Sequence, residues 1–342
     1  MSASDYDHRA LEQRRPGRES TDGSLDLIEL VRLGTLAASS HNTQPWRFHL
    51  GARAIEIAPD ISRRCPVVDP DNSHLYKSLG CAAENIVHAA AAQGHFARWR
   101  YDAARDRVVV DCEASSAAKP GELFRAITRR QCTRQPFDAQ PLGATDRAAL
   151  DRAGQGAGVR IAWVDDRARI DSVIDFVSRG NRTQLSDPAF RRELIGWLRF
   201  NPGAAMKAGD GLSGRASGNP QLPTWLGRFV IDLVLTPDEQ AETDARNIRS
   251  SAGVAVFVSD GDEPGAWVAT GAAFERFALQ ATALGIRTAF INQPIEVRAL
   301  RPQFESWLGL AGAHAQLMVR YGRGPESPFS LRRPVESVIA QA

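Results

Sequence analysis

The sequence predicts an α+β fold, and three observations support this prediction. Segments with apolar residues every three or four positions, typical of amphipathic helices, alternate along the chain with short runs of strand length. Residues 46–57 form a hairpin pattern, in which two alternating runs flank a Gly-containing turn. The 342 residues suffice for about two domains with a substantial core. We therefore expect helices packed on short-stranded sheets.

The first half of the chain is expected to hold two helices and four strands. Ser24 is expected to cap the first helix, at 25–38, which ends in the polar turn 39–45. The hairpin at 46–57 is followed by a helix at about 73–93 and by strands at 96–101 and 107–111. Residues 1–24 lack an apolar segment, so they are expected to form a polar, poorly ordered tail.

The second half begins at a Lys-Pro-Gly boundary at 119–121. Its helices are expected near 122–130, 146–153, 170–185, 268–284 and 297–308, and its strands at 159–164, 254–259, 288–291 and 315–321. Residues 187–249 carry few regular signals, and the stretch 203–223 within them is rich in Gly, Ser, Ala and Pro. A segment of this length is expected to be a lid or flap, whose aromatic residues either cover a site or pack against the flap itself.

An internal echo links the two halves. Residues 80–94 can be laid over residues 271–285 with Gly, Ala, Glu, Ala, Ala and Gly in register. Both windows are Ala-rich helices followed by a strand. Two such helices can agree by chance, so the echo is either a true repeat or a coincidence of composition. Its paired acids, Glu84 and Glu275, are expected to cap or bridge helices rather than transfer protons.

The composition argues against several classes of protein. The 42 Lys and Arg nearly balance the 40 Asp and Glu, whereas nucleic-acid or membrane-surface binding calls for a basic excess. No apolar run approaches the length of a membrane span. Four cysteines without CxxC spacing indicate a reducing cytoplasm and give no support for a metal site. The expected partner is therefore a small molecule.

Two polar clusters carry the candidate chemistry. The first follows the helix at 25–38, where Ser39, Ser40, Asn42 and Gln44 offer hydroxyl and amide groups that match the alternating C=O and N–H edge of a planar heterocycle. The alternative is a helix C-cap that runs into an edge strand.

The second cluster contains Arg130 and Arg134, which share a face if the helix continues through them. A guanidinium fork bonds two phosphate oxygens at once, so the cluster suits a phosphate. The alternative is a solvated basic turn. Neither a GxGxxG nor a GxxxxGK[ST] phosphate motif follows an expected strand.

Together these segments resemble the FMN-dependent nitroreductase family. Residues 38–46 fit its Pro-Ser-x-x-Asn-x-Gln-Pro-Trp element closely. Residues 129–137 fit its Arg-Arg-Ser-x-Arg-x-Phe element more loosely, with Cys132 in place of the usual serine and one extra residue before the phenylalanine. Residues 285–292 look like the family's helix-to-strand segment beside the flavin, and residues 331–335 like its Arg-containing tail.

The order of these elements is unusual for the family. In its ordinary members each chain carries both elements, and the flavin lies at a homodimer interface. Here each half carries one of them, which is similar to the Acg-type branch, in which a single chain imitates the dimer. The resemblance implies two nitroreductase-like halves, 25–118 and 119–342, which form an intrachain pseudo-dimer with a lid insertion at about 187–249. Each half would be a mixed or antiparallel sheet flanked by helices, and a monomer can suffice.

The resemblance also implies a cofactor, a reaction and a set of contacts. A hydride would pass from NADH or NADPH to N5 of FMN, and the electrons then to a nitroaromatic, a quinone or a similar acceptor. The implied cofactor contacts are Arg130 and Arg332 at the phosphate, Arg134 near the pyrimidine, Ser39, Ser40, Asn42 and Gln44 from the other half, and Phe290, Ile291 and Asn292 beside the flavin, with the backbone N–H near Asn292 facing N5. No catalytic residue is assigned. The alternative is a flavin-sequestering protein whose lid blocks the nicotinamide.

Overall fold

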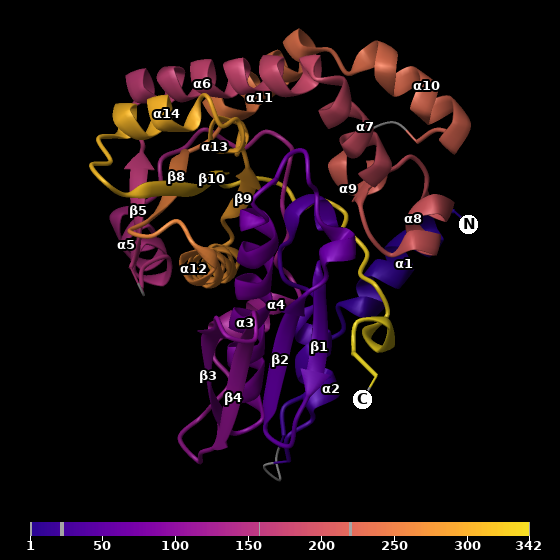
Figure 1. Cartoon of the computed structure of the whole chain (residues 1–342), viewed down its shortest axis with the longest axis vertical. Helices are drawn as coiled ribbons and strands as arrows, with labels where there is room; N and C mark the ends of the chain where they lie inside the picture. The colour runs from indigo at the N-terminus through magenta and orange to yellow at the C-terminus, as the bar shows by residue number, and fades with distance from the viewer. Residues whose placement is uncertain (1, 21–23, 157, 219–220, 342) are drawn as a thin grey trace.

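The computed structural model describes residues 2–20, 24–156, 158–218 and 221–341 of the chain (Figure 1). It contains two four-stranded antiparallel sheets, each packed against helices, so the prediction of an α+β fold is confirmed. Among the described residues, no helix has both the length and the apolar character that crossing a bilayer requires.

The N-terminal sheet has the strand order β1-β2-β4-β3. Its strands are β1 (Trp46–Leu50), β2 (Ala54–Pro59), β3 (His95–Asp102) and β4 (Arg107–Ala114), and the helices α2 (Leu27–Gly34) and α3 (Ser73–Ala92) pack with it. Trp46 and Phe48 are buried, whereas the intervening Arg47 is exposed, as the alternating pattern predicts. The cap of α2 is Asp26 and not Ser24, because the Asp26 carboxylate accepts from Glu29 N.

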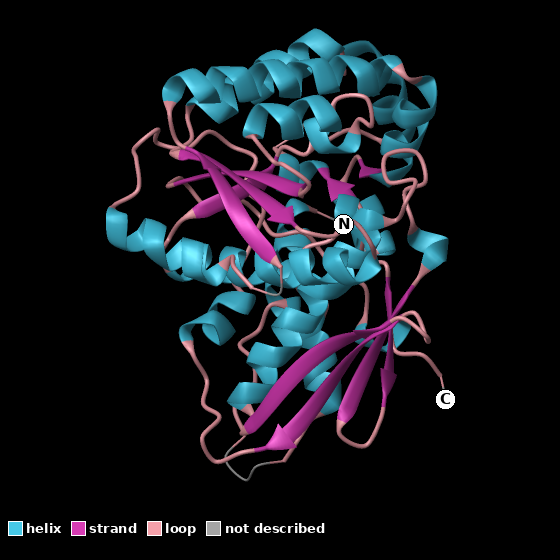
Figure 2. Ribbon diagram, turned by 60° about the vertical axis from the view of Figure 1, so that its left-hand side comes forward, coloured by secondary structure: helices cyan, strands magenta, loops and turns pink. Residues whose placement is uncertain are grey.

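The C-terminal sheet has the strand order β5-β8-β10-β9. In both sheets, therefore, the four strands counted along the chain lie side by side in the order first, second, fourth, third. Its strands are β5 (Val159–Val164), β8 (Gly253–Ser259), β9 (Arg287–Phe290) and β10 (His314–Gly322). Every residue of β8 is buried, because helices cover both faces of this sheet (Figure 2). Around it lie α4 (Glu122–Ile127), α5 (Ala144–Ala153), α6 (Arg167–Ser186), α12 (Pro264–Ala283), α13 (Gln293–Glu296) and α14 (Arg301–Leu308).

The two echoed helices, α3 and α12, pack directly on each other at their glycines. A Cβ on Gly80 would lie 2.0 Å from Val268 O, and a Cβ on Gly271 would lie 1.9 Å from Lys77 O. The contact is reciprocal, since each glycine meets the residue three positions before the other. Such mutual contacts are typical of a two-fold interface. In addition, Glu84 of α3 pairs with Arg276 of α12 at 2.7 Å, so this acid bridges helices as expected.

The expectation of few regular elements in residues 187–249 is wrong. The segment forms α7 (Pro188–Trp197), β6 (Leu198–Arg199), α8 (Pro202–Ala208), β7 (Leu212–Ser213), α9 (Gly214–Ser217), α10 (Thr224–Val234) and α11 (Pro237–Arg249). Three of its helices begin with a capping residue followed by proline, and these caps are Asp187, Asn201 and Thr236. A capping residue before proline is a helix-start signal that can be recognised in the sequence. In Figure 1, α7 to α10 arch over the side of the molecule where the N-terminus lies.

Both ends of the chain are tied to distant segments. Residues expected to be a poorly ordered tail form the helix α1 (Ala3–Gln13), and its Tyr6 is fully buried. The expectation for residues 21–23 falls outside the described residues. At the other end, Val338 O accepts from Phe48 N, and Ala340 N donates to Phe48 O, so the C-terminal segment extends the edge of the N-terminal sheet.

Candidate functional site

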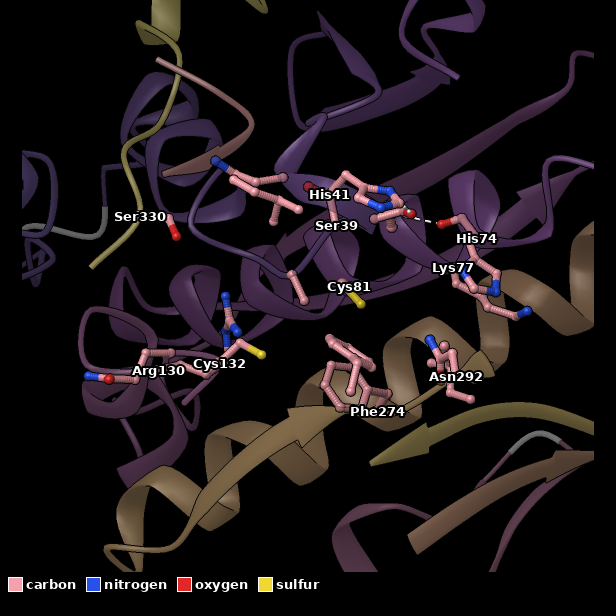
Figure 3. A pocket seen from close by; sticks show the side chains of 18 of the residues that line it. Ser39, His41, His74, Lys77, Cys81, Arg130, Cys132, Phe274, Asn292 and Ser330 are labelled. Carbon is pink, nitrogen blue, oxygen red and sulfur yellow. Dashed lines mark hydrogen bonds between the residues drawn. The ribbon is translucent and has the colours of Figure 1, made fainter. Parts of the chain in front are cut away.

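A cavity of about 220 Å³ lies where the two sheet-bearing halves meet. Figure 3 shows Arg130, Cys132 and Ser330 toward one end of it and His41, His74 and Lys77 toward the other. Eight of the ten predicted cofactor residues line this cavity: Ser39, Ser40, Asn42, Arg130, Arg134, Phe290, Asn292 and Arg332. The other two, Gln44 and Ile291, are buried outside its lining.

The loop after α2 reaches the cavity through a strained backbone. His41, Asn42 and Gln44 have φ angles of 46°, 54° and 54°, which lie in the left-handed region that non-glycine residues seldom adopt. Ser39 Oγ accepts from Gln44 N at 3.1 Å and closes the turn. Conformations of this kind persist only where surrounding contacts enforce them, and they are frequent at functional sites.

The amides of this loop bond to the protein itself. Asn42 Nδ2 donates to Gly211 O and to Leu331 O, both at 3.1 Å. Gln44 Nε2 donates to Gly209 O at 2.9 Å, and its Oε1 accepts from Arg333 N at 2.8 Å. The two amides therefore fasten the lid and the C-terminal segment to the loop. Ser39 and Ser40 line the cavity, and Ser40 Oγ lies 3.4 Å from His41 Nδ1.

Arg130 lies beyond its helix, because α4 ends at Ile127; the helix does not continue, so Arg130 and Arg134 do not share a helical face. The segment instead runs along the edge of the C-terminal sheet, where Thr133 N donates to Thr288 O at 2.9 Å. Arg130 Nη2 donates to Leu36 O at 2.8 Å, and its Nε lies 2.8 Å from Oε1 of the fully buried Glu275.

Two further guanidinium groups join Arg130 at this end of the cavity. Arg332 donates to the carbonyls of Thr35, Leu36 and Ala37. It therefore satisfies carbonyls of the turn that directly follows α2. Arg14, from the end of α1, is equally buried and lines the same cavity. Burial, and then the neighbouring cations, lower the pKa of Arg14, and burial with Arg130 nearby lowers the pKa of Arg332 to about 9.

The basic end suits an anion. Three guanidinium groups meet one carboxylate, Glu275, whose own pKa is raised by burial. Among the described residues, Arg14 Nε and Gln131 Nε2 are buried donors without an acceptor, and both residues line the cavity. Buried cations and orphaned donors are unfavourable unless an anion compensates them. The donor set of this chain therefore fits a phosphate group, which offers several acceptor oxygens.

The opposite end carries a cluster of buried titratable groups. Lys77 Nζ donates to Ser73 Oγ at 3.1 Å, and burial lowers its pKa to about 7. Glu296 accepts from Gln184 Nε2 at 2.7 Å, and burial raises its pKa to about 7. His74 Nδ1 lies 3.7 Å from Glu296 Oε1. Groups that titrate near neutrality beside a cavity are suited to hold or release a proton there.

The floor of the cavity is aromatic, and a second cavity adjoins it. The rings of Phe274 and Phe290 pack against each other in a tilted arrangement, with centroids 4.7 Å apart. Asn292 Oδ1 accepts from Met318 N at 2.7 Å, which fixes the strand end beside them. A neighbouring cavity of about 240 Å³ shares His41, Phe290, Asn292 and Glu296 with the first and extends between α6 and α7. A planar ligand on the aromatic floor would thus lie next to a further space.

Sequence reasoning missed five residues of the site: Arg14, His74, Lys77, Glu275 and Glu296. One signal was available for two of them, since His74 and Lys77 are polar residues three apart on the buried face of a helix. The others come together only in the tertiary structure.

The comparisons with known proteins find relatives and solved structures that are named as nitroreductases. No protein-family model matches the chain. Two curated proteins of Mycobacterium tuberculosis, Rv3131 from strain H37Rv and MT3217 from strain CDC 1551, are named provisionally as NAD(P)H nitroreductases. Each is 26% identical over 322 residues, which cover 91% of this chain and 90% of the relative.

Solved structures similar to the chain include two nitroreductases. The FMN-dependent nitroreductase NfnB from Mycobacterium smegmatis, in complex with NADPH, matches with 14% identity and a TM-score of 0.43, covering 65% of this chain and 98% of its own. A nitroreductase with bound FMN from Bacteroides fragilis matches with 14% identity and a TM-score of 0.39, covering 63% and 94%. The similarity to the two curated proteins extends over 91% of the chain.

Proposed function

We propose that the protein is an FMN-binding oxidoreductase of the nitroreductase type. The observation that carries the proposal is the cavity between the halves, which combines an aromatic floor with three buried guanidinium groups at one end. A planar, phosphate-bearing cofactor matches both features. The names of the two curated relatives support the same activity.

We further propose that residues 25–118 and 119–342 are two nitroreductase-like halves that form an intrachain pseudo-dimer, as in the Acg-type branch. The shared strand order and the reciprocal contact of Gly80 and Gly271 support this arrangement. Each half supplies part of the cavity wall, so a monomer is sufficient for one composite site. The four cysteines are free, which agrees with a cytoplasmic location.

Bound FMN would supply the redox chemistry, taking a hydride from NADH or NADPH at N5 and passing two electrons to a nitroaromatic, a quinone or a similar acceptor. Arg130 would hold the phosphate, and Arg134 would favour negative charge at the pyrimidine end. Arg332 adds positive charge, while its N–H groups stay bonded to the carbonyls of the turn after α2. Ser39 and Ser40 would donate to the ring edge, and Phe290 and Asn292 would border it. Asn42 and Gln44 would shape the loop behind these contacts, and Ile291 the core.

Reconstitution with FMN followed by anaerobic reduction tests this function. We expect the purified protein to bind one FMN and NADH or NADPH to bleach the bound flavin, after which a nitroaromatic or a quinone restores its colour. A protein that binds no FMN after reconstitution contradicts the proposal.

A flavin-sequestering protein is a second candidate, and the lid contacts favour it. Asp210 of the lid accepts from Arg199 at 2.6 Å and pairs with Arg63 of the first half. Leu212 of the lid lines the cavity. If this closed lid excludes nicotinamide, dithionite will bleach the bound flavin while NADH and NADPH do not. Rapid bleaching by either nucleotide refutes the sequestering function.

A further inference from the structure

The N-terminal helix α1 is bonded to two segments that border the site. Tyr6 Oη donates to Phe329 O at 2.9 Å. Gln13 makes two hydrogen bonds with the backbone of Arg332: its Nε2 donates to Arg332 O at 2.7 Å, and its Oε1 accepts from Arg332 N at 2.8 Å. Arg9 donates to Met206 O of the lid helix α8 at 3.1 Å. These contacts fix the direction in which the chain leaves α1.

The residue that follows α1, Arg14, therefore lies at the basic end of the cavity. Arg14 caps α1 and is 6% exposed. Its Nη1 donates to Thr128 O at 3.2 Å and to Arg130 O at 3.1 Å. Among the described residues these are the only hydrogen bonds of its guanidinium, which also lies 4.3 Å from the centroid of the Phe329 ring, and no carboxylate pairs with it. Its guanidinium is therefore the least compensated of the three.

Arg14 differs in this respect from its two neighbours. Arg332 donates hydrogen bonds from Nε and Nη2 to backbone carbonyls and from Nη1 to Asn42 Oδ1. Arg130 has Glu275 as its counter-ion. A buried cation without a counter-ion is unfavourable, and an anion placed beside it offsets that unfavourable energy.

We propose that Arg14 binds the phosphate group of the cofactor, so that helix α1 closes the anionic end of the site. This inference rests on the proposed function, in which the ligand is FMN. It gives the N-terminal helix a role in binding, because α1 ends at Arg14 and is bonded to the C-terminal segment that carries Arg332.

Comparing FMN with riboflavin tests the contact, because riboflavin has the same ring and no phosphate. We expect Arg14→Gln to weaken FMN binding about 10- to 100-fold and to leave riboflavin binding unchanged. Arg14→Lys should recover part of the loss. Arg9→Gln is the matched control, because it removes one charge and one lid contact from the same helix without touching the cavity; it should preserve the affinity for FMN. An equal loss for both flavins shows a structural role and overturns the proposal, as does an unchanged FMN affinity.

Hydrogen exchange on residues 3–13 supplies a readout independent of activity. FMN should slow exchange in α1 of the wild type more than riboflavin does, and this difference should disappear in Arg14→Gln. Equal protection by both flavins counts against the contact.

Inorganic phosphate separates this inference from the proposed function. We expect phosphate to raise the melting temperature of the flavin-free wild type and to raise that of Arg14→Gln less. If the wild type binds no FMN but shows this Arg14-dependent effect, the proposed function fails and the anion site stands. If phosphate stabilises both proteins equally, Arg14 is not an anion ligand.

Discussion

The close packing of α3 on α12 predicts that alanine at Gly271 destabilises the protein, although alanine is the better helix former. The added Cβ would lie 1.9 Å from Lys77 O, and real Cβ contacts below 3.0 Å are essentially unknown. The obstacle is helix backbone and not a flexible side chain, so the two helices must separate by about 1 Å. The same argument applies to Gly80, whose Cβ would lie 2.0 Å from Val268 O.

The expected magnitude follows from two opposing effects. Replacing glycine by alanine inside a helix gains about 1 kcal/mol. Overpacking a rigid core costs about 1 to 3 kcal/mol, and a clash with backbone belongs at the upper end of that range. The net loss in the free energy of unfolding for Gly271→Ala is therefore about 2 kcal/mol. Because Lys77 and Phe274 on these helices line the cavity, FMN binding should weaken as well.

Urea unfolding of Gly271→Ala, Gly80→Ala and the control Gly196→Ala measures this effect. Gly196 lies in α7 with no atom within 4 Å of its would-be Cβ, so alanine there should be neutral or stabilise by up to about 1 kcal/mol. The double variant at 80 and 271 should lose less than the sum of the two single variants, because one separation relieves both clashes. A Gly271→Ala protein as stable as the Gly196→Ala control refutes the argument.

Three further predictions concern charged groups. Glu275→Gln should lower the free energy of unfolding by about 3 to 5 kcal/mol, because it leaves Arg130 uncompensated, and added phosphate should restore part of the loss in urea unfolding; unchanged stability contradicts the pairing. The pKa of Lys77 is about 7 in the folded protein, against a usual 10.5. Between pH 7 and pH 10.5 the Lys77 amine is therefore protonated in the unfolded chain and neutral in the folded one. The free energy of unfolding of the wild type, relative to that of Lys77→Met, should therefore rise from about pH 7 to pH 10 and stay constant just below pH 7. A difference between the two proteins that does not change from pH 7 to pH 10 would show that Lys77 is not desolvated. Asp210→Asn should speed anaerobic reduction of the bound flavin about tenfold in stopped-flow mixing by loosening the lid. An unchanged rate would show that the lid does not limit access, with the exposed Asp238→Asn as the control.

Much of the fold could be predicted because its signals are local. The hairpin β1–β2, the helices α3 and α12 and the strands of both sheets lie within a few residues of their expected positions. Periodicity of 2 or 3.6 residues is a property of each segment and needs no knowledge of its neighbours. The lid helices also carried local signals in their capping residues and prolines, which were outweighed by the Gly- and Ser-rich composition of the segment.

The candidate site was predictable only in part. Ser39, Asn42 and Arg130 form recognisable motifs, and the structure brings them to one cavity. The amide of Asn42, however, bonds lid and tail carbonyls instead of facing the cavity alone. Glu275 gave no local sign of its role, because its partner Arg130 lies 145 positions away.

The sequence by itself determined the α+β class, the similarity between residues 80–94 and 271–285, and the polar motifs of the candidate site, because these depend on residue types at short spacing. Only the tertiary structure decided which donors remain free. The N–H groups of Arg332 bond carbonyls of the turn after α2, Arg130 pairs with Glu275, and Arg14 has no counter-ion among the described residues. The physical reason is that the charge balance of a buried site depends on groups that folding brings together from distant parts of the chain, and no local pattern records their distances.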